Sequence, residues 1–345
     1  MAWLFLLTYW IVAIVVASFF YAAWNKGITI TIRLHAIIHA KSFAPEGLPE
    51  HLARGAAFEA DRLRVDVGFD SVRGTRGPAR AQGKVGVTAL TVAAGVVTKA
   101  GRHQERALGP LRRGPVGISG WTLEAGDPLG LFRTRTTGKE MELTLILPRF
   151  ASLRAQPLVR ELEASVTASR AGTGTEIFGV REYRPGDPLR RIHWRSTARR
   201  GELIVREFEP PAVHNLGIFC DPRPTTDLEA DQIARLAASE AWDCLRAGGR
   251  VTLWAPGCEP SRPDEERNLF ALLEWLARYP HATGEAVPPP PVGDAIAITS
   301  KSEGQLLDAV ETVRLHGGSV RAWVVGDAVL ESDIPVQRAG LGWPL

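Results

Sequence analysis

The stretch from Ala2 to Trp24 contains no charged side chain, and it constrains the fold of the chain more than any other feature. As a helix, it is long enough to cross the hydrocarbon core of a bilayer. Aromatic residues lie near both of its ends, as in helices whose ends meet the two membrane interfaces. The stretch fits poorly the pattern of a cleaved signal peptide, which has a basic start, a shorter apolar core and a small-residue cleavage site. We therefore predict a transmembrane anchor over residues 1–26; the alternative is a buried helix of a soluble protein.

Positive charges follow the apolar stretch. Lys26, Arg33 and Lys41 precede the first acidic residue, Glu46, whereas the other flank carries only the chain amine. Basic residues are enriched on the cytoplasmic side of membrane spans. The sequence thus predicts a single-pass protein of the cell membrane whose soluble part is cytoplasmic.

Composition sets broad limits on the soluble part. At 345 residues, with 45% hydrophobic and 23% charged residues, the chain is long enough for two domains that each bury a core. The formal net charge of +3 is too small to indicate nucleic-acid binding by itself. The three cysteines, Cys220, Cys244 and Cys258, do not have the spacing of a metal site, and we expect Cys220 and Cys244 in the core.

Residues 27–150 show short runs with strand patterning, punctuated by Gly and Pro. Such runs, separated by turn signals, are typical of a small β-sandwich. The first run, Ile28–Ile38, is expected to be a strand or a stem that leaves the membrane; the further expected strands are Leu63–Val67, Val85–Val92, Val116–Ile118 and Glu142–Leu147. Asp127, which precedes Pro128, is expected to bond to the backbone of its own turn rather than to act as a catalytic acid.

Residues 151–212 include an arginine-rich stretch, Gly172 to Pro210, in which acidic and large apolar side chains alternate with the arginines. This mixture is not typical of a disordered charge block. The interleaved acids would repel a phosphate backbone, so we expect no nucleic-acid partner. Bidentate arginines suit interfaces, and we expect ion pairs here to join the two flanking domains. The residues concerned are Arg181, Arg190 and Arg191 with Glu182 and Asp187.

Residues 213–345 alternate strands with helices, which implies a parallel sheet with right-handed crossovers. The expected strands are 216–220, 251–254, 295–298 and 320–325, and the expected helices are 227–247, 269–277 and a third that Ser302 and Gln305 cap. Thr226 and Glu229 form a capping box at the start of the first helix. Ligands of such sheets bind beyond the carboxyl ends of the strands, and Asp221 lies at that edge.

Three segments together resemble one bacterial family, known as domain of unknown function 58. They are RRGPVGISGWTLEAGDPLGLFR at Arg112–Arg133 with LILPR at Leu145–Arg149, FGVREYRPGDPLRRIHW at Phe178–Trp194 with LIVREFE at Leu203–Glu209, and the strand that ends at Asp221. The resemblance covers most of the chain after the anchor. It implies a membrane anchor, a β-rich domain, the arginine-rich signature and a von Willebrand factor A-like, Rossmann-like α/β domain. The signature positions that it marks as candidate binding residues are Arg181, Tyr183, Gly186, Asp187, Arg190, Arg191, His193 and Trp194.

The resemblance also implies a partner. Members of this family are often encoded beside MoxR-type AAA+ ATPases, which implies a role in the assembly or maturation of protein complexes at the membrane. Relatives usually look as if they have two membrane helices, whereas this chain has one clear span.

The resemblance bears on metal binding as well. A von Willebrand A-like domain with a working metal site has Asp-x-Ser-x-Ser after its first strand. The corresponding residues here are Asp221-Pro222-Arg223-Pro224-Thr225, so a cation replaces the first hydroxyl ligand. We therefore expect no cofactor and no working Mg²⁺ site: Asp221 and Thr225 form a degenerate site, in which Arg223 could pair with Asp221 in place of the metal.

Two hypotheses of function follow. The favoured one is a non-catalytic, membrane-anchored scaffold or adaptor that presents the Asp221 edge to a protein partner. The alternative is a metal-dependent or hydrolytic enzyme that uses Asp221, His193 or Asp187. No nucleophile, base and orienting group form a recognisable set, so no catalytic residue is assigned. His193, without a Ser or Cys nucleophile placed beside it by a known motif, is expected to be a hydrogen-bonded structural residue.

Overall fold

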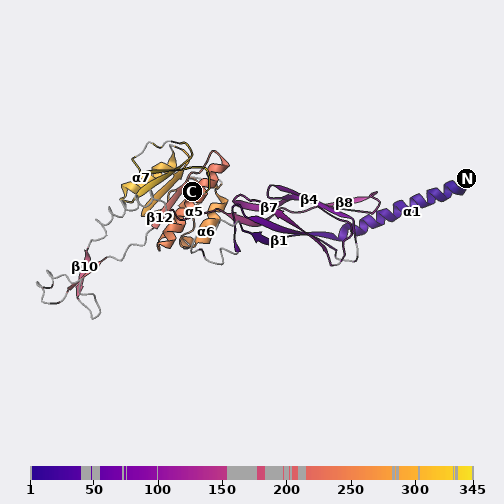
Figure 1. Cartoon of the computed structure of the whole chain (residues 1–345), viewed down its shortest axis with the longest axis horizontal. Helices are drawn as coiled ribbons and strands as arrows, with labels where there is room; N and C mark the ends of the chain where they lie inside the picture. Colours follow the sequence, from indigo (N-terminus) through magenta and orange to yellow (C-terminus); the bar gives the residue numbers. More distant parts are fainter. Residues whose placement is uncertain are drawn as a thin grey trace. The chain divides into compact units, whose positions relative to one another are not determined.

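Figure 1 shows the computed structural model of the chain. The structure describes residues 2–39, 48, 55–71, 74, 76–98, 100–153, 177–182, 197, 202, 204–208, 215–281, 284, 287–301, 304–328, 330 and 333–343. The chain divides into two compact units. The first comprises Met1–Arg149 with Leu276–Tyr279, and the second comprises Phe150–Trp275 with Pro280–Leu345.

Helix α1 (Ala2–Trp24) confirms the predicted apolar helix. Its side chains are largely exposed; for example, Trp10 is 62% exposed and Phe20 is 67% exposed. Only 11% of the apolar segment Leu6–Trp24 is buried, which argues against the alternative of a soluble protein's core helix. Among the described residues, α1 is the one helix whose length and composition suit a membrane span. That α1 crosses a membrane stays a prediction.

Asn25 joins the end of α1 to the β-strands of the first unit. It begins the short 3-10 turn η1 (Asn25–Gly27) and is fully buried. Its side-chain amide donates to the carbonyl oxygens of Gly77, at 3.0 Å, and Gly126, at 2.5 Å. In return, the Gly77 N–H donates to the Asn25 side-chain oxygen at 3.2 Å. These bonds fix the point at which the helix meets the strands.

Two β-sheets share the first unit. The three-stranded sheet has the order β1-β3-β6, and the six-stranded sheet has the order β2-β9-β7-β4-β5, with β8 paired to β7. Neighbours are antiparallel except β2 and β9, which are parallel. The bounds are β1 (Ile28–Ile38), β2 (Ala57–Phe58), β3 (Arg62–Ser71), β4 (Ala79–Val85), β5 (Thr88–Ala94), β6 (Arg102–Leu108), β7 (Gly114–Gly126), β8 (Arg133–Thr137) and β9 (Met141–Leu147).

One apolar core lies between these strands. Val65, Val67 and Phe69 of β3 are fully buried, and they belong to the same cluster as Ile118 and Trp121 of β7. Along β3, buried residues alternate with exposed ones over its first half, because successive side chains of a strand point to opposite faces. The β-rich prediction for this region is therefore confirmed as antiparallel sheets that share a core.

The predicted single strand over residues 85–92 is wrong. β4 ends at Val85, the chain turns at Gly86 and Val87, and β5 begins at Thr88. Gly86 has a φ of 57°, which glycine adopts without steric cost. The turn was not predicted because Val87 is apolar and continues the strand pattern, although it is 95% exposed at the tip of the turn.

Strands β6 and β8 were not predicted because their sequences are polar. β6 reads RHQERAL and β8 reads RTRTT, and most of their residues are exposed. Each lies at an edge of its sheet, where one side of the strand faces solvent instead of a neighbouring strand. The hydrophobic alternation by which strands are recognised is therefore weak there.

The second unit holds a parallel sheet with the order β13-β12-β14-β15-β16, which confirms the predicted α/β region. Its identity as a von Willebrand A-like domain stays a prediction. The bounds are β12 (Asn215–Cys220), α5 (Asp227–Arg246), β13 (Arg250–Trp254), η4 (Pro263–Glu265), α6 (Leu269–Arg278), β14 (Asp294–Thr299), α7 (Gln305–Leu315), β15 (Val320–Val325) and β16 (Val336–Ala339). A separate two-stranded antiparallel sheet consists of β10 (Ile177–Glu182) and β11 (Ile204–Phe208).

Helices α5 and α7 pack against the parallel sheet, α5 on β12 and β13 and α7 on β14 and β15. The predicted capping box of α5 is confirmed: the Thr226 hydroxyl accepts from the Glu229 N–H, and the Glu229 carboxylate accepts from the Thr226 N–H. The cap of α7 is Gly304, without a side-chain bond, and Ser302 lies outside the described residues.

The core of the second unit contains cysteines and buried acidic side chains, among them Glu240. Cys220 and Cys244 are buried, as predicted, and so is Cys258. Glu240 of α5, which is 3% exposed, accepts hydrogen bonds from Arg321 at 2.6 Å and from Trp323 at 2.7 Å. Both donors lie on β15. This bonding satisfies a buried carboxylate and attaches α5 to the sheet.

Candidate functional site at the Asp221 edge

Asp221 directly follows the buried strand β12, at the carboxyl edge of the parallel sheet. Its side chain is 3% exposed, and its backbone N–H donates to the Ile298 carbonyl of β14 at 3.0 Å. β12 lies between β13 and β14, so the order in which strands are added to the sheet changes direction at β12. Open α/β sheets bind ligands at the edge where neighbouring connections diverge in this way.

The Asp221 carboxylate holds the loops that follow β12 and β14. Its Oδ1 accepts from the backbone N–H of Arg223 at 2.9 Å. Its Oδ2 accepts from the Ser300 hydroxyl at 3.0 Å and from the Ser300 N–H at 3.3 Å. The Thr299 hydroxyl lies 3.5 Å from the same oxygen. One buried carboxylate therefore orders the backbone of two loops that are far apart in the sequence.

Lys301 adds a second connection between the same loops. Its ammonium group donates to the carbonyl oxygen of Arg223, and its backbone N–H donates to the Thr299 hydroxyl oxygen at 3.0 Å. The Arg223 and Lys301 side chains are exposed. The edge therefore combines a buried acid with two cationic side chains at the surface.

The predicted residues of the degenerate metal site contact different partners. Arg223 meets Asp221 through its backbone N–H and carries an exposed side chain. Thr225 is exposed, and its backbone N–H donates to Glu229 at 2.8 Å, in the first turn of α5. Thr299 and Ser300, which sequence reasoning missed, are the hydroxyl residues at the Asp221 carboxylate. Their position directly after the third predicted strand was the signal that could have found them.

These donors do not fit a Mg²⁺ site. Mg²⁺ takes oxygen ligands in near-octahedral geometry, and carboxylates are its usual protein ligands. Among the described residues, the carboxylate at this edge is that of Asp221, and both of its oxygens already accept from N–H or O–H groups. In the part of the chain that the structure describes, His, Cys, Asp and Glu side chains form no group of three that could hold a metal.

The arginine-rich signature is described only in part. Arg181 lies on β10, opposite Val205 of β11. The other predicted signature residues lie outside the described residues: Tyr183, Gly186, Asp187, Arg190, Arg191, His193 and Trp194. The predicted ion pairs between domains, and the structural role of His193, therefore stay predictions.

Comparison with known proteins adds two similarities. Residues 179–287, which include the signature, β12, α5 and Asp221, match the model of the family described as "Protein of unknown function DUF58". The chain is also similar to the uncharacterized protein YeaD of Bacillus subtilis, with 28% identity over 163 residues. That match spans 46% of this chain and 38% of the length of YeaD.

Proposed function

We propose that the chain, which carries a DUF58 family domain over residues 179–287, is a membrane-anchored, non-catalytic adaptor. α1 anchors it as a single span of the cell membrane, with the soluble part in the cytoplasm. The Asp221 edge of the parallel sheet presents a recognition surface to a protein partner. The proposed partner is a MoxR-type AAA+ ATPase, and the process is the assembly or maturation of protein complexes.

The observation that carries the proposal is the bonding of Asp221. Its carboxylate accepts from Arg223 in one loop and from Ser300 in the other, and it is buried while doing so. A side chain used in this way fixes the surface around it. A rigid, preorganised surface loses little conformational entropy when a partner binds.

The exposed side chains at this edge indicate the chemistry of the partner. Arg223 and Lys301 are cationic and exposed, and Leu228 in the first turn of α5 is 55% exposed. Two cations beside an exposed apolar residue suit an acidic surface with an apolar centre. Complementary charges of this kind select the partner and speed its association.

A pull-down from detergent-solubilised membranes, analysed by mass spectrometry, tests the proposal. We expect the wild type to recover an AAA+ ATPase and the Arg223→Glu variant to recover several-fold less. The matched control is Arg314→Glu, which reverses an exposed charge in the last turn of α7. Equal loss with both variants would show that recovery depends on net charge rather than on the Asp221 edge.

The enzyme alternative predicts a different result. It requires turnover that Asp221→Ala abolishes, together with no recovered AAA+ partner. A panel of model ester and phosphate substrates, assayed with the wild type and Asp221→Ala, supplies the measurement. Turnover that depends on Asp221, without a partner, would overturn the adaptor proposal.

The proposed orientation has its own test. In sealed vesicles with the cytoplasmic face inward, protease added outside should leave the soluble part intact. Digestion without detergent would place the soluble part on the opposite side and overturn the cytoplasmic proposal.

A further inference from the structure

The loop Asp127–Phe132, which joins β7 to β8, has a rigid base and an apolar tip. Asp127 is 1% exposed, and its carboxylate accepts from the N–H groups of Leu129 at 2.9 Å and Phe132 at 2.6 Å. These bonds confirm the predicted turn role of Asp127. Leu129 and Leu131, which the bonded Asp127 holds outward at the tip, are 64% and 52% exposed.

Ionised Asp127 suits this arrangement. Burial raises the pKa of its carboxyl group. Hydrogen bonds from the Phe132 and Leu129 N–H groups and from the Ser18 hydroxyl lower the pKa, and together they outweigh the effect of burial. The pKa therefore lies below the usual value for Asp. At neutral pH the carboxylate is charged and accepts bonds on the loop side and on the α1 side, so that the loop keeps its shape.

The same loop lies against α1 well before the helix ends. Ser18 bonds to Asp127, and it is 6% exposed whereas the neighbouring Phe19 is 55% exposed. The rings of Phe19 and Phe132 meet edge to face, with centroids 5.6 Å apart. The helix continues beyond this contact to Trp24.

The length of α1 then places the loop relative to a bilayer. A helix rises about 1.5 Å per residue, so Ser18 lies about 9 Å before Trp24 along the axis. The hydrocarbon core is about 30 Å thick and needs about 20 helical residues. The part of α1 from Ala2 to Ser18 reaches only about 24 Å. If α1 spans the core, the contact at Ser18 and Phe19 falls within the span or at its boundary, and the loop reaches that depth with it.

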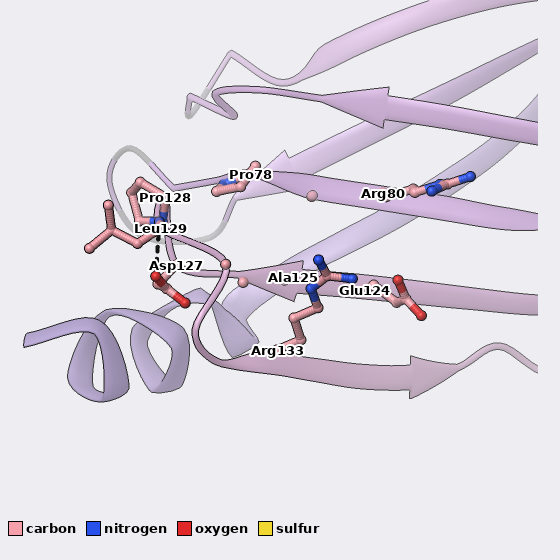
Figure 2. A pocket seen from close by; sticks show the side chains of 11 residues that line it. Pro78, Arg80, Glu124, Ala125, Asp127, Pro128, Leu129 and Arg133 are labelled. Carbon is pink, nitrogen blue, oxygen red and sulfur yellow. Dashed lines mark hydrogen bonds between the residues drawn. The ribbon is translucent and has the colours of Figure 1, made fainter. Parts of the chain in front are cut away.

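Cationic side chains lie on the strands next to the apolar tip of the loop. Arg80 of β4 and Arg133 of β8 are exposed and line a cavity of about 300 Å³ together with Asp127 and Leu129. Figure 2 shows Leu129 at the loop, with Arg80 and Arg133 on the neighbouring strands. Trp24, whose ring the Arg76 guanidinium covers at 5.0 Å, is 56% exposed. An apolar tip followed by cations and an interfacial aromatic ring is the pattern of segments that bind anionic bilayer surfaces.

We propose that the loop Asp127–Phe132 dips into the bilayer beside α1, with Leu129 and Leu131 in the interfacial layer and Arg80 and Arg133 at anionic lipid headgroups. The occupant of this surface is the lipid bilayer, because the loop is continuous with the membrane-spanning face of α1. The inference rests on the anchoring part of the proposed function and extends it. The loop is a second membrane contact, which holds the first unit in one orientation against the surface.

Site-specific fluorescence in the full-length protein tests the proposal. Leu129→Cys is labelled with an environment-sensitive nitrobenzoxadiazole dye, and the protein is reconstituted into vesicles of zwitterionic and anionic phospholipids. The matched control is Val87→Cys. Val87 is an exposed apolar residue in the turn that follows β4, and Ala79, which lines the cavity, lies at the opposite end of that strand. The native cysteines are buried, so the dye reacts at the introduced one.

We expect the dye at position 129 to emit at shorter wavelength than the dye at position 87. We also expect several-fold weaker quenching by aqueous iodide at position 129, and strong quenching by lipids with a doxyl group near the headgroup. Water-like emission and full iodide quenching at position 129 would overturn the proposal. Shielding from iodide without quenching by doxyl lipid would also overturn it, since a protein, such as a second copy, would then cover the loop.

Alkaline carbonate extraction separates this inference from the proposed function. If the wild type is extracted from membranes, the anchor is wrong and the inference falls with it. If the wild type stays in membranes but the dye at position 129 reports water, the inference alone is wrong. The ATPase pull-down depends on neither result.

Discussion

Asn25 bonds to both backbone groups of Gly77, donating to its carbonyl at 3.0 Å and accepting from its N–H at 3.2 Å. The pair is buried and joins residues that are 52 positions apart. A side-chain amide thus completes the backbone bonding of Gly77, which a strand neighbour would normally supply. The exit of α1 is thereby fixed to the strands of the first unit.

We expect Asn25→Ala to destabilise the protein by roughly 1–3 kcal/mol, because it leaves the buried backbone groups of Gly77 and Gly126 without this partner. Denaturant unfolding of the detergent-solubilised protein measures the loss. Thr29→Ala is the control, since its hydroxyl makes one exposed bond of 3.4 Å to Asp70. Equal effects of the two substitutions would contradict the fixed exit.

The lowered pKa of Asp127 predicts how stability depends on pH. Its folded pKa lies below the unfolded value, so its contribution is present above the unfolded pKa, about 3.9, and is lost as pH falls through the folded pKa. We therefore expect the difference in melting temperature between the wild type and Asp127→Asn to be constant near neutral pH and to shrink in strong acid. A difference that grows as the pH falls would have the wrong sign.

Two ion pairs have the same N···O distance, 2.6 Å, but different surroundings: Glu240 with Arg321, and Glu311 with Arg314. Glu240 has 3% of its side chain exposed, whereas Glu311 has 38% exposed. Because water weakens exposed pairs, we expect Glu311→Ala to cost less than about 0.5 kcal/mol. Glu240→Ala should cost about 3 kcal/mol, since it leaves Arg321 and Trp323 without a buried acceptor. Glu240→Gln should cost less, because the amide oxygen still accepts from Trp323. Equilibrium unfolding of the three variants gives the comparison.

The features predicted from the sequence are those that local signals encode. The apolar helix follows from the absence of charge, and the start of α5 follows from Thr226 and Glu229, three residues apart. The parallel strands of the second unit are short apolar runs, because both of their faces are covered. The edge strands β6 and β8 escaped because their exposed residues dilute that pattern.

The contacts that escaped prediction join residues distant in the sequence. Gly126, which Asn25 contacts, is 101 residues away, and Ser300 is 79 residues from Asp221. Nothing in the residues near Asn25 or Asp221 encodes these partners; the order of the strands brings them together. The sequence could therefore place Asp221, and Thr299 and Ser300 after a neighbouring strand, at the carboxyl edge of the sheet, but not show which of these side chains bond to each other.

Thr225 and Thr226 are neighbours, but their substitution by alanine should affect stability to different degrees. Thr226→Ala removes the cap acceptor of α5 and should cost about 1 kcal/mol. Thr225→Ala should change stability by less than about 0.5 kcal/mol, since its exposed side chain is not part of the cap. Unfolding experiments on both variants measure the difference.

The same pair tests the degenerate metal site. Calorimetric titration of the wild type with Mg²⁺ should give no stoichiometric binding, because the Asp221 oxygens already accept from Arg223 and Ser300. Thr225→Ala should then leave the titration unchanged. Tight one-to-one binding to the wild type that Thr225→Ala weakens, while Thr226→Ala does not, would show that Asp221 and Thr225 coordinate a metal after all. In that case the bonds to Asp221 would have to rearrange on binding, and the Asp221 edge would respond to the metal rather than be fixed.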